Sequence, residues 1–263
     1  MESVLTRKTI ATYAIGSLGT GGFATLPGLV LVIYMTDTLG IAPLAAGILV
    51  TAAKVWDVII DPVIGARSDR SLALRGSRRP FMIAGALALP VFFILTFAVP
   101  AGTGPVVAGV WVLLAFLITA TAFSLFQVPY IALPAELASG YDDRTKLISA
   151  RVVVLTLAIL IFGGGAPEIQ KAFADPYTGY LVMAVVAGVL IGAGMLVSSF
   201  VARRGEPVAA ESFSILDNYR TGIAALRRSQ PFRSLLATFL LEGLATGLML
   251  AGAAYLSKWV LRS

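Results

Sequence analysis

Three charged residues lie inside an otherwise apolar stretch, KVWDVIIDPVIG, at residues 54–65. Lys54, Asp57 and Asp61 are spaced i, i+3 and i+7, so an α-helix would hold all three within about 60° of arc. Two carboxylates one helical turn apart repel each other unless a cation or a proton lies between them. The spacing therefore indicates a binding site for Na⁺ or H⁺. The structural alternative is that Lys54 pairs with Asp57 while Asp61 caps another group.

The composition places this stretch inside a membrane. Of the 263 residues, 58% are hydrophobic and 13% are charged, whereas soluble domains carry about 25% charged residues. Residues 81–100 and 105–134 contain no charged residue, and about 20 helical residues cross the hydrocarbon core of a bilayer. A charged side chain at mid-bilayer costs at least ~2.5–3.5 kcal/mol. We therefore expect an all-α polytopic membrane protein in which these charges face a bundle interior or a wet cavity.

Seven membrane-spanning helices are expected, and the basic residues orient them. Fifteen Lys and Arg residues lie in the N-terminus and in the loops on its side, against one, Lys171, in the alternate loops. This asymmetry predicts a multi-pass protein of the cytoplasmic (inner) membrane with a cytoplasmic N-terminus. It also accounts for the net charge of +6 without a nucleic-acid partner. The expected spans are residues 10–35, 42–66, 80–100, 105–133, 147–168, 180–202 and 233–260.

The chain is expected to divide into three parts. Residues 1–202 would form an N-terminal six-helix transmembrane half of the major facilitator type, built from two inverted three-helix repeats. Residues 203–232 would be a cytoplasmic linker with an amphipathic helix, and residues 233–263 the first helix of a C-terminal half that is otherwise absent. The apolar residues at helical spacing in the linker are Phe213, Leu216, Tyr219, Ile223 and Leu226.

Enzymatic chemistry is not indicated. The sequence contains no histidine and no cysteine, which excludes imidazole and thiol catalysis and thiolate metal sites. The stretch GTGGFA at residues 19–24 matches a dinucleotide-binding pattern, but that pattern requires a preceding strand and a βαβ unit. Here it lies in a predicted membrane helix, which favours close helix packing and a cavity wall. We therefore expect neither an enzyme nor a cofactor.

Polar side chains in two further spans are candidates for the same cavity. Ser124 and Gln127 are at i and i+3, and Ile131 follows one turn later, so a hydroxyl and an amide share one helix face. Such side chains serve either as a site or as hydrogen bonds between helices. Arg151 lies one turn inside the fifth span. It either extends back to the interface or reaches the cavity and holds an anionic or hydroxylated group.

Several motifs together resemble the glycoside–pentoside–hexuronide:cation symporter family of the major facilitator superfamily. They are YAIGSLGTGGF, KVWDVIIDPVIG, SRRPFMIAGA, FQVPYIALPAEL and DDRTKLISAR, in that order. The WD-x-x-x-DP element is the most specific, and the resemblance covers the whole chain as that family's N-terminal half plus its seventh helix. It implies that Asp57 and Asp61 bind the coupling cation together with the Ser124 hydroxyl, with Lys54 as a charge partner in the cavity. Gln127, on the same helix face as Ser124, is a further candidate ligand of the cation.

The resemblance also implies a substrate site, and the sequence departs from the family there. Gly21 and Gln127 stand where the family has two aspartates that grip sugar hydroxyls, and Ile131 stands where it has a tryptophan that lines the pocket. Arg151 matches the family's arginine near the sugar. Fewer carboxylates remain to accept hydrogen bonds from hydroxyl groups. A galactoside is therefore disfavoured, and H⁺ becomes a rival of Na⁺.

We predict a cation-coupled secondary active symporter, using Na⁺ or H⁺, for a small organic solute that is sugar-like by resemblance. One alternative is a symporter of lysolipids or other less polar solutes. Another is a half-carrier or membrane assembly protein that transports nothing. The expected partners are membrane lipid, the solute and the missing C-terminal half, on the same or a separate chain. No role is assigned to Glu242, a lone carboxylate in the seventh span.

Overall fold

A computed structural model describes residues 5–138, 140–202 and 228–256, and every regular element in these ranges is helical. The predicted amphipathic helix of the linker, with Phe213 and Leu216, lies outside the described residues. The π-helices are η1 (Pro27–Leu31) and η2 (Tyr34–Thr38). The α-helices are α1 (Arg7–Ala14), α2 (Ser17–Leu26), α3 (Pro43–Arg75), α4 (Arg79–Phe97), α5 (Pro105–Leu137), α6 (Tyr141–Lys171), α7 (Pro176–Ser199) and α9 (Gln230–Leu256).

Six helical segments in the described ranges are long and apolar enough to cross a membrane, which confirms a multi-pass helical protein. The first is Arg7–Thr38, which runs from the start of α1 to the end of η2. The other five are α3, α4, α5, α6 and α7. The seventh predicted segment forms the helix α9, and its crossing of a membrane stays a prediction. The chain divides into two compact units, residues 1–209 and 210–263, and all six of these segments belong to the first unit.

Helices α3 and α6 extend furthest beyond their predicted ends, because a helix need not end where the apolar core of a membrane ends. Helix α3 continues nine residues past the predicted boundary at residue 66, and α6 begins six residues before residue 147. Both extensions are rich in charged residues, which favours a location at the membrane interface. Helix α3 also continues through Pro62, although proline removes one hydrogen bond of the helical ladder.

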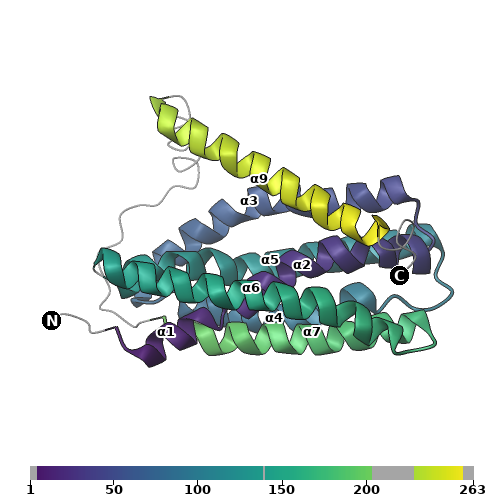
Figure 1. Ribbon diagram of the computed structural model, residues 1–263, viewed down its shortest axis with the longest axis horizontal. Coiled ribbons are helices and arrows are strands. Elements are labelled where there is room, and N and C mark those ends of the chain that lie inside the picture. The colour runs from purple at the N-terminus through teal and green to yellow at the C-terminus, as the bar shows by residue number, and fades with distance from the viewer. Residues whose placement is uncertain (1–4, 139, 203–227, 257–263) are drawn as a thin grey trace. The chain divides into compact units, whose positions relative to one another are not determined.

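The helices of the first unit pack around α4 and α2. Helix α4 packs against α5 and α7, α2 packs against α6 and α7, and the main contact of α3 is with α5 (Figure 1). Aromatic rings fill the centre of one end, where Tyr34 and Phe97 are fully buried and the Tyr34 hydroxyl donates to the Phe97 carbonyl at 3.1 Å. Small residues allow close approach elsewhere: a Cβ on Gly85 would lie 2.5 Å from the Ala122 carbonyl oxygen.

The turn between α3 and α4 is held by an arginine at its end. Arg78 immediately precedes α4, and its Nη1 donates to Asp69 and, at 2.9 Å, to the Ser68 hydroxyl. Its Nε donates to Glu136 at 2.5 Å, which ties the turn to the end of α5. The Arg78 side chain is only 11% exposed, so this network joins three helices with a largely buried cation.

The N-terminus of α7 is capped by the side chain of Asp175. The Asp175 carboxylate accepts hydrogen bonds from the Thr178 hydroxyl at 2.6 Å and from the Thr178 backbone N–H at 2.9 Å. These two donors lower the pKa of the Asp175 carboxyl, because they stabilise its charged form.

Candidate functional site

The two aspartates of the predicted cation site lie on the side of α3 that turns toward α5. Ala53 and Ile64 on this side are buried, and Asp57 and Asp61 are partly buried between them. The apolar side chains of Val58 and Ile59 are exposed instead. This division of α3 into a carboxylate-bearing inner side and an apolar outer side agrees with the expectation drawn from helical spacing.

Each aspartate has one carboxylate oxygen that is buried without a hydrogen-bond donor among the described residues. These atoms are Asp57 Oδ1 and Asp61 Oδ1. The other oxygen of Asp57, Oδ2, lies 3.4 Å from Nζ of Lys54. A buried acceptor without a donor costs about 1–3 kcal/mol, and more when it is charged. At i and i+4 the two side chains are neighbours, about 5–6 Å apart at Cβ, so the orphaned oxygens would suit a shared cation or proton.

Lys54 differs from the two aspartates in its surroundings. Its side chain is 62% exposed, against 19% for the Asp57 side chain with which it pairs. The structural alternative, a Lys54–Asp57 pair, is therefore present in the structure, but it occupies only one oxygen of Asp57. Lys54 thus offsets one of the two negative charges and leaves the group of three at a net charge of −1.

Helix α5 is connected to α3 and to α2 by hydrogen bonds of its polar side chains. The Thr121 hydroxyl accepts a hydrogen bond from Nε1 of Trp56 on α3 at 2.8 Å. Six residues further on, Gln127 Oε1 accepts a hydrogen bond from the Thr20 hydroxyl of α2 at 2.8 Å. Ser124 lies between these positions and is buried. The predicted amide and hydroxyl thus lie on a helix that contacts both the carboxylate-bearing helix and the first span.

Gly21, predicted to line the substrate cavity, lies in the contact between α2 and α6. A Cβ on this glycine would lie 2.6 Å from the Ala158 Cβ and 2.9 Å from the Leu155 carbonyl oxygen. The missing side chain therefore allows two helices to approach, which agrees with the close helix packing expected for GTGGFA. The place of Gly21 in a substrate cavity stays a prediction.

Replacing Gly21 with alanine should destabilise the bundle by about 1–3 kcal/mol, because the added methyl group has no room beside the α6 backbone. Gly164 on α6 is a matched control, since nothing lies within 4 Å of a Cβ at that position. Thermal unfolding of the two variants in detergent checks this. Equal melting temperatures for Gly21→Ala and Gly164→Ala would contradict the packing role.

Arg151 on α6 lies against a cluster of buried hydroxyl groups. Its guanidinium carbon is 5.3 Å from the centroid of the Tyr130 ring, within the range of a cation–π contact. The Tyr130 hydroxyl donates to the Tyr13 carbonyl at 2.9 Å and lies 2.9 Å from the Ser17 hydroxyl. Nε of Arg151 and the Tyr13 hydroxyl are buried without a hydrogen-bond partner in the described part of the chain. They would suit a bound polar group.

Tyr130→Phe should lower stability by about 1–3 kcal/mol, because the Tyr13 carbonyl and the Ser17 hydroxyl would lose a buried partner. The ring under Arg151 would remain. Tyr141, which is 84% exposed, provides a control in Tyr141→Phe. The expected result is a lower melting temperature for the first variant alone. A melting temperature of Tyr130→Phe equal to that of the wild type would count against this network.

The structure arranges the predicted residues on four helices and adds partners that sequence reasoning missed. Ile131 on α5 is 53% exposed, so it is available to line an open surface. The missed partners are Trp56, Thr121, Thr20, Tyr13, Ser17 and Tyr130. Trp56 and Tyr130 lie within the quoted motifs KVWDVIIDPVIG and FQVPYIALPAEL, so the motifs themselves pointed to these two residues. The other four required knowledge of which helices are neighbours.

Comparison with known proteins identifies the family. The model of the MFS/sugar transport protein family matches residues 12–263, nearly the whole chain. The chain therefore belongs to this family. Because the family consists of transport proteins, the predicted class, a major facilitator-type transport protein and not an enzyme, is confirmed.

Three relatives illustrate the range of the family. The chain is 31% identical to an uncharacterized symporter, sll1374, of Synechocystis over 64% of this chain and 33% of the relative. It is 26% identical to the glucuronide carrier protein homolog of Escherichia coli over 73% of this chain and 43% of the relative. It is 30% identical to the sodium-dependent lysophosphatidylcholine symporter 1 of Mus musculus over 51% of this chain and 26% of the relative. The match thus covers less than half of each relative's length.

Proposed function

We propose that the chain forms the cation-binding half of a secondary active symporter and that Asp57 and Asp61 bind the coupling cation. The main observation in support is the pair of buried carboxylate oxygens, Asp57 Oδ1 and Asp61 Oδ1, to which the described residues donate no hydrogen bond. Ionisable groups inside a membrane protein usually belong to ion or substrate pathways, because their burial is costly in free energy and they are rarely kept without a function. Ser124 and Gln127 on α5 assist as oxygen ligands.

The charge of the site suits one monovalent cation. Asp57 and Asp61 contribute two negative charges and Lys54 one positive charge, so one Na⁺ or one H⁺ neutralises the group. Either ion would satisfy the orphaned oxygens: Na⁺ would be coordinated by both of them, and H⁺ would form a hydrogen bond between them. One relative is named as a sodium-dependent symporter, which favours coupling to a cation.

Lys54→Gln tests this charge balance. Removal of the positive charge should strengthen cation binding, because it removes repulsion between Lys54 and the cation. The side chain is 62% exposed, so solvent screens the effect and we expect a gain in apparent cation affinity of up to about fivefold. The half-saturating cation concentration for uptake measures it. A weaker apparent affinity in Lys54→Gln would show that the lysine supports the site instead.

The proposed substrate is a small organic solute, sugar-like by family resemblance. Arg151 would hold it through the unpartnered Nε, Gln127 through its amide, and Gly21 and Ile131 would line the apolar wall. The protein would alternate access by rocking this half against a second half on the same or a separate chain. We place the N-terminus in the cytoplasm and the protein in the cytoplasmic (inner) membrane, from the distribution of Lys and Arg.

A lysolipid-like solute is the second candidate. The observation that favours it is Ile131, an exposed apolar side chain on the face that carries Gln127. The similarity to a protein named as a lysophosphatidylcholine symporter points the same way. Apolar solutes gain about 25 cal/mol per Å² of surface that leaves water, and this contribution would replace hydrogen bonds to hydroxyl groups.

A ligand screen on the complete protein tests the proposed function. Thermal unfolding is measured with hexoses, pentosides, hexuronides and lysolipids, each with and without Na⁺ and at two pH values. A transporter that couples solute to cation should be stabilised more by both together than by the sum of each alone. Stabilisation by lysolipids alone would favour the second candidate. No stabilisation by any solute and cation pair would support a protein that transports nothing.

A further inference from the structure

The turn between α3 and α4 presents arginines on a rigid support. Gly76 ends α3 in the left-handed conformation, with φ of 66°. The Ser71 hydroxyl donates to the Ser77 carbonyl at 2.9 Å, and the Ser77 hydroxyl accepts from the backbone N–H of Arg79 at 3.2 Å. These bonds fix Arg75 and Arg79 on the two sides of the turn.

The carboxylates near this turn are already engaged by one arginine. Arg78 binds both Asp69 and Glu136. Within the described residues, no carboxylate forms an ion pair with the four neighbours Arg67, Arg70, Arg75 and Arg79. Nε of Arg79 is buried without a hydrogen-bond partner there. The turn therefore carries positive charge that the described part of the chain does not neutralise.

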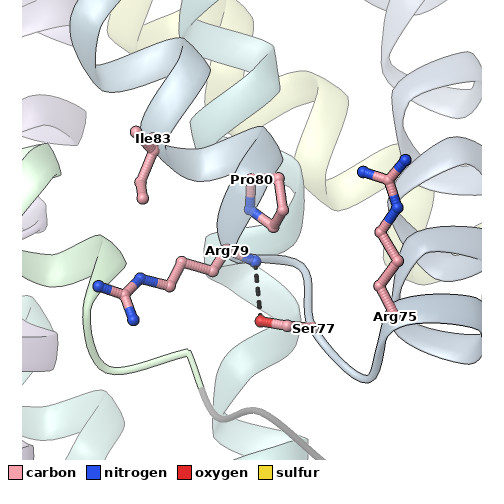
Figure 2. A pocket seen from close by; sticks show the side chains of 5 residues that line it. All are labelled: Arg75, Ser77, Arg79, Pro80 and Ile83. Carbon is pink, nitrogen blue, oxygen red and sulfur yellow. Dashed lines mark hydrogen bonds between the residues drawn. The ribbon is translucent and has the colours of Figure 1, made fainter. Parts of the chain in front are cut away.

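Two adjoining cavities open beside these arginines. One of 420 Å³ is lined by Arg75, Ser77, Arg79, Pro80 and Ile83. The other, of 350 Å³, is lined by Arg67, Arg70, Ser71, Leu74, Arg75 and Phe81. Figure 2 shows Arg75 and Arg79 on either side of Pro80, with the Arg79 side chain extending toward the side of Ile83. Arg75 lines both cavities.

The lining combines two kinds of surface. Guanidinium groups bind phosphate oxygens through paired N–H donors, and the Ser77 and Ser71 hydroxyl groups lie beside them. Leu74, Phe81, Pro80 and Ile83 add apolar surface, and Leu74 is 52% exposed. The Arg79 guanidinium also lies over the Phe200 ring at 4.1 Å. A stacked guanidinium keeps the donors along its edge available.

We propose that these two cavities bind an anionic phospholipid, with its phosphate on Arg75, which lines both cavities, and its glycerol and upper acyl carbons on Pro80 and Ile83. Arg79, on the other side of Pro80, adds its positive charge to the attraction (Figure 2). A free anion would use the arginines but not the apolar lining. The position favours lipid as well, because the turn joins the ends of two helices that are apolar enough to cross a membrane. Basic pockets between such helices recognise lipid headgroups. Lipid binding here does not depend on what the chain transports.

Native mass spectrometry of the complete protein in detergent tests this proposal. The probes are phosphatidylglycerol, phosphatidylcholine and inorganic phosphate, applied to the wild type, Arg75→Gln, the Arg75→Gln/Arg79→Gln double variant and Arg7→Gln. Arg7 is an exposed arginine outside both cavities, so its substitution makes the same change in charge. Each basic residue contributes about fivefold to binding of an anionic lipid.

The expected result is a preference for phosphatidylglycerol over phosphatidylcholine of at least about 25-fold in the wild type, since two arginines each contribute about fivefold. This preference should fall about fivefold in Arg75→Gln and about 25-fold in the double variant, with no change in Arg7→Gln. Equal binding of the two lipids, or an unchanged preference in the double variant, would overturn the proposal. Displacement of phosphatidylglycerol by millimolar inorganic phosphate would show a site for free anions and would also overturn it. Circular dichroism of each variant confirms that the helices remain folded.

Discussion

Cation-dependent uptake should fall on the order of 100-fold in Asp57→Asn and in Asp61→Asn, measured in vesicles that contain the complete protein. Each substitution keeps the shape of the side chain and removes one negative charge from the site. Interactions with a charged partner contribute about 1.5–3 kcal/mol each, and about 1.4 kcal/mol corresponds to a factor of ten. Removal of either charge leaves the remaining aspartate and Lys54 at a net charge of zero, which no longer attracts a cation.

Glu168→Gln provides the control for these two variants. Glu168 lies near the C-terminal end of α6, its side chain is 75% exposed, and it pairs with Lys171 at 3.7 Å. This variant also removes one carboxylate from a helix that is apolar enough to cross a membrane, but outside the proposed site. Its uptake should equal that of the wild type. Wild-type uptake in both aspartate variants would refute the cation site, whatever the substrate is.

Arg78→Ala should lower the free energy of unfolding by about 2–3 kcal/mol. Loss of one partner of a buried ion pair costs about 3–5 kcal/mol. The value is smaller here because Asp69 and Glu136 are 41% and 23% exposed, so water partly solvates the carboxylates left behind. The expected decrease in melting temperature is about 5–10 °C, measured in detergent by the fluorescence of the tryptophans.

Arg78→Lys and Arg75→Ala separate the geometry of this network from its charge. A lysine ammonium is a single point charge and cannot reproduce the planar fork that binds Asp69, Ser68 and Glu136 together. The melting temperature of Arg78→Lys should therefore lie between those of the wild type and Arg78→Ala. Arg75 is exposed and has no ion pair within the described ranges, so Arg75→Ala should melt as the wild type does. If Arg75→Ala lost as much stability as Arg78→Ala, the loss would come from the reduced positive charge of the turn and not from the hydrogen-bond network of Arg78.

Much of the helical layout follows from the sequence alone, because long apolar runs have few alternatives in a bilayer. The charge-free run at residues 105–134 predicts α5, and the turn-to-turn spacing of Asp57 and Asp61 predicts their shared side of α3. The inward position of that side also follows, since a charged group facing lipid would be too costly. These inferences need only the period of the helix and the thickness of the membrane.

Contacts between helices were harder to predict from the sequence, because they join residues that are distant in the chain. Gly21 illustrates this: its lack of a side chain is compatible with a cavity wall and with close packing, and the packing became evident only from the position of Ala158. The hydrogen bond from Trp56 to Thr121 spans 65 positions in the sequence. The network of Arg78 also required knowledge that the end of α5 lies beside the turn between α3 and α4.

Binding of one cation per chain to the purified complete protein is the most direct measurement of the site. ²²Na⁺ binding and proton uptake are followed together over a pH titration, for the wild type and for Asp57→Asn/Asp61→Asn. The wild type should bind either one Na⁺ that displaces a proton or one proton that Na⁺ does not displace, and the double variant should bind neither at the site. Identical Na⁺ and proton binding by both proteins would contradict a coupling site at Asp57 and Asp61.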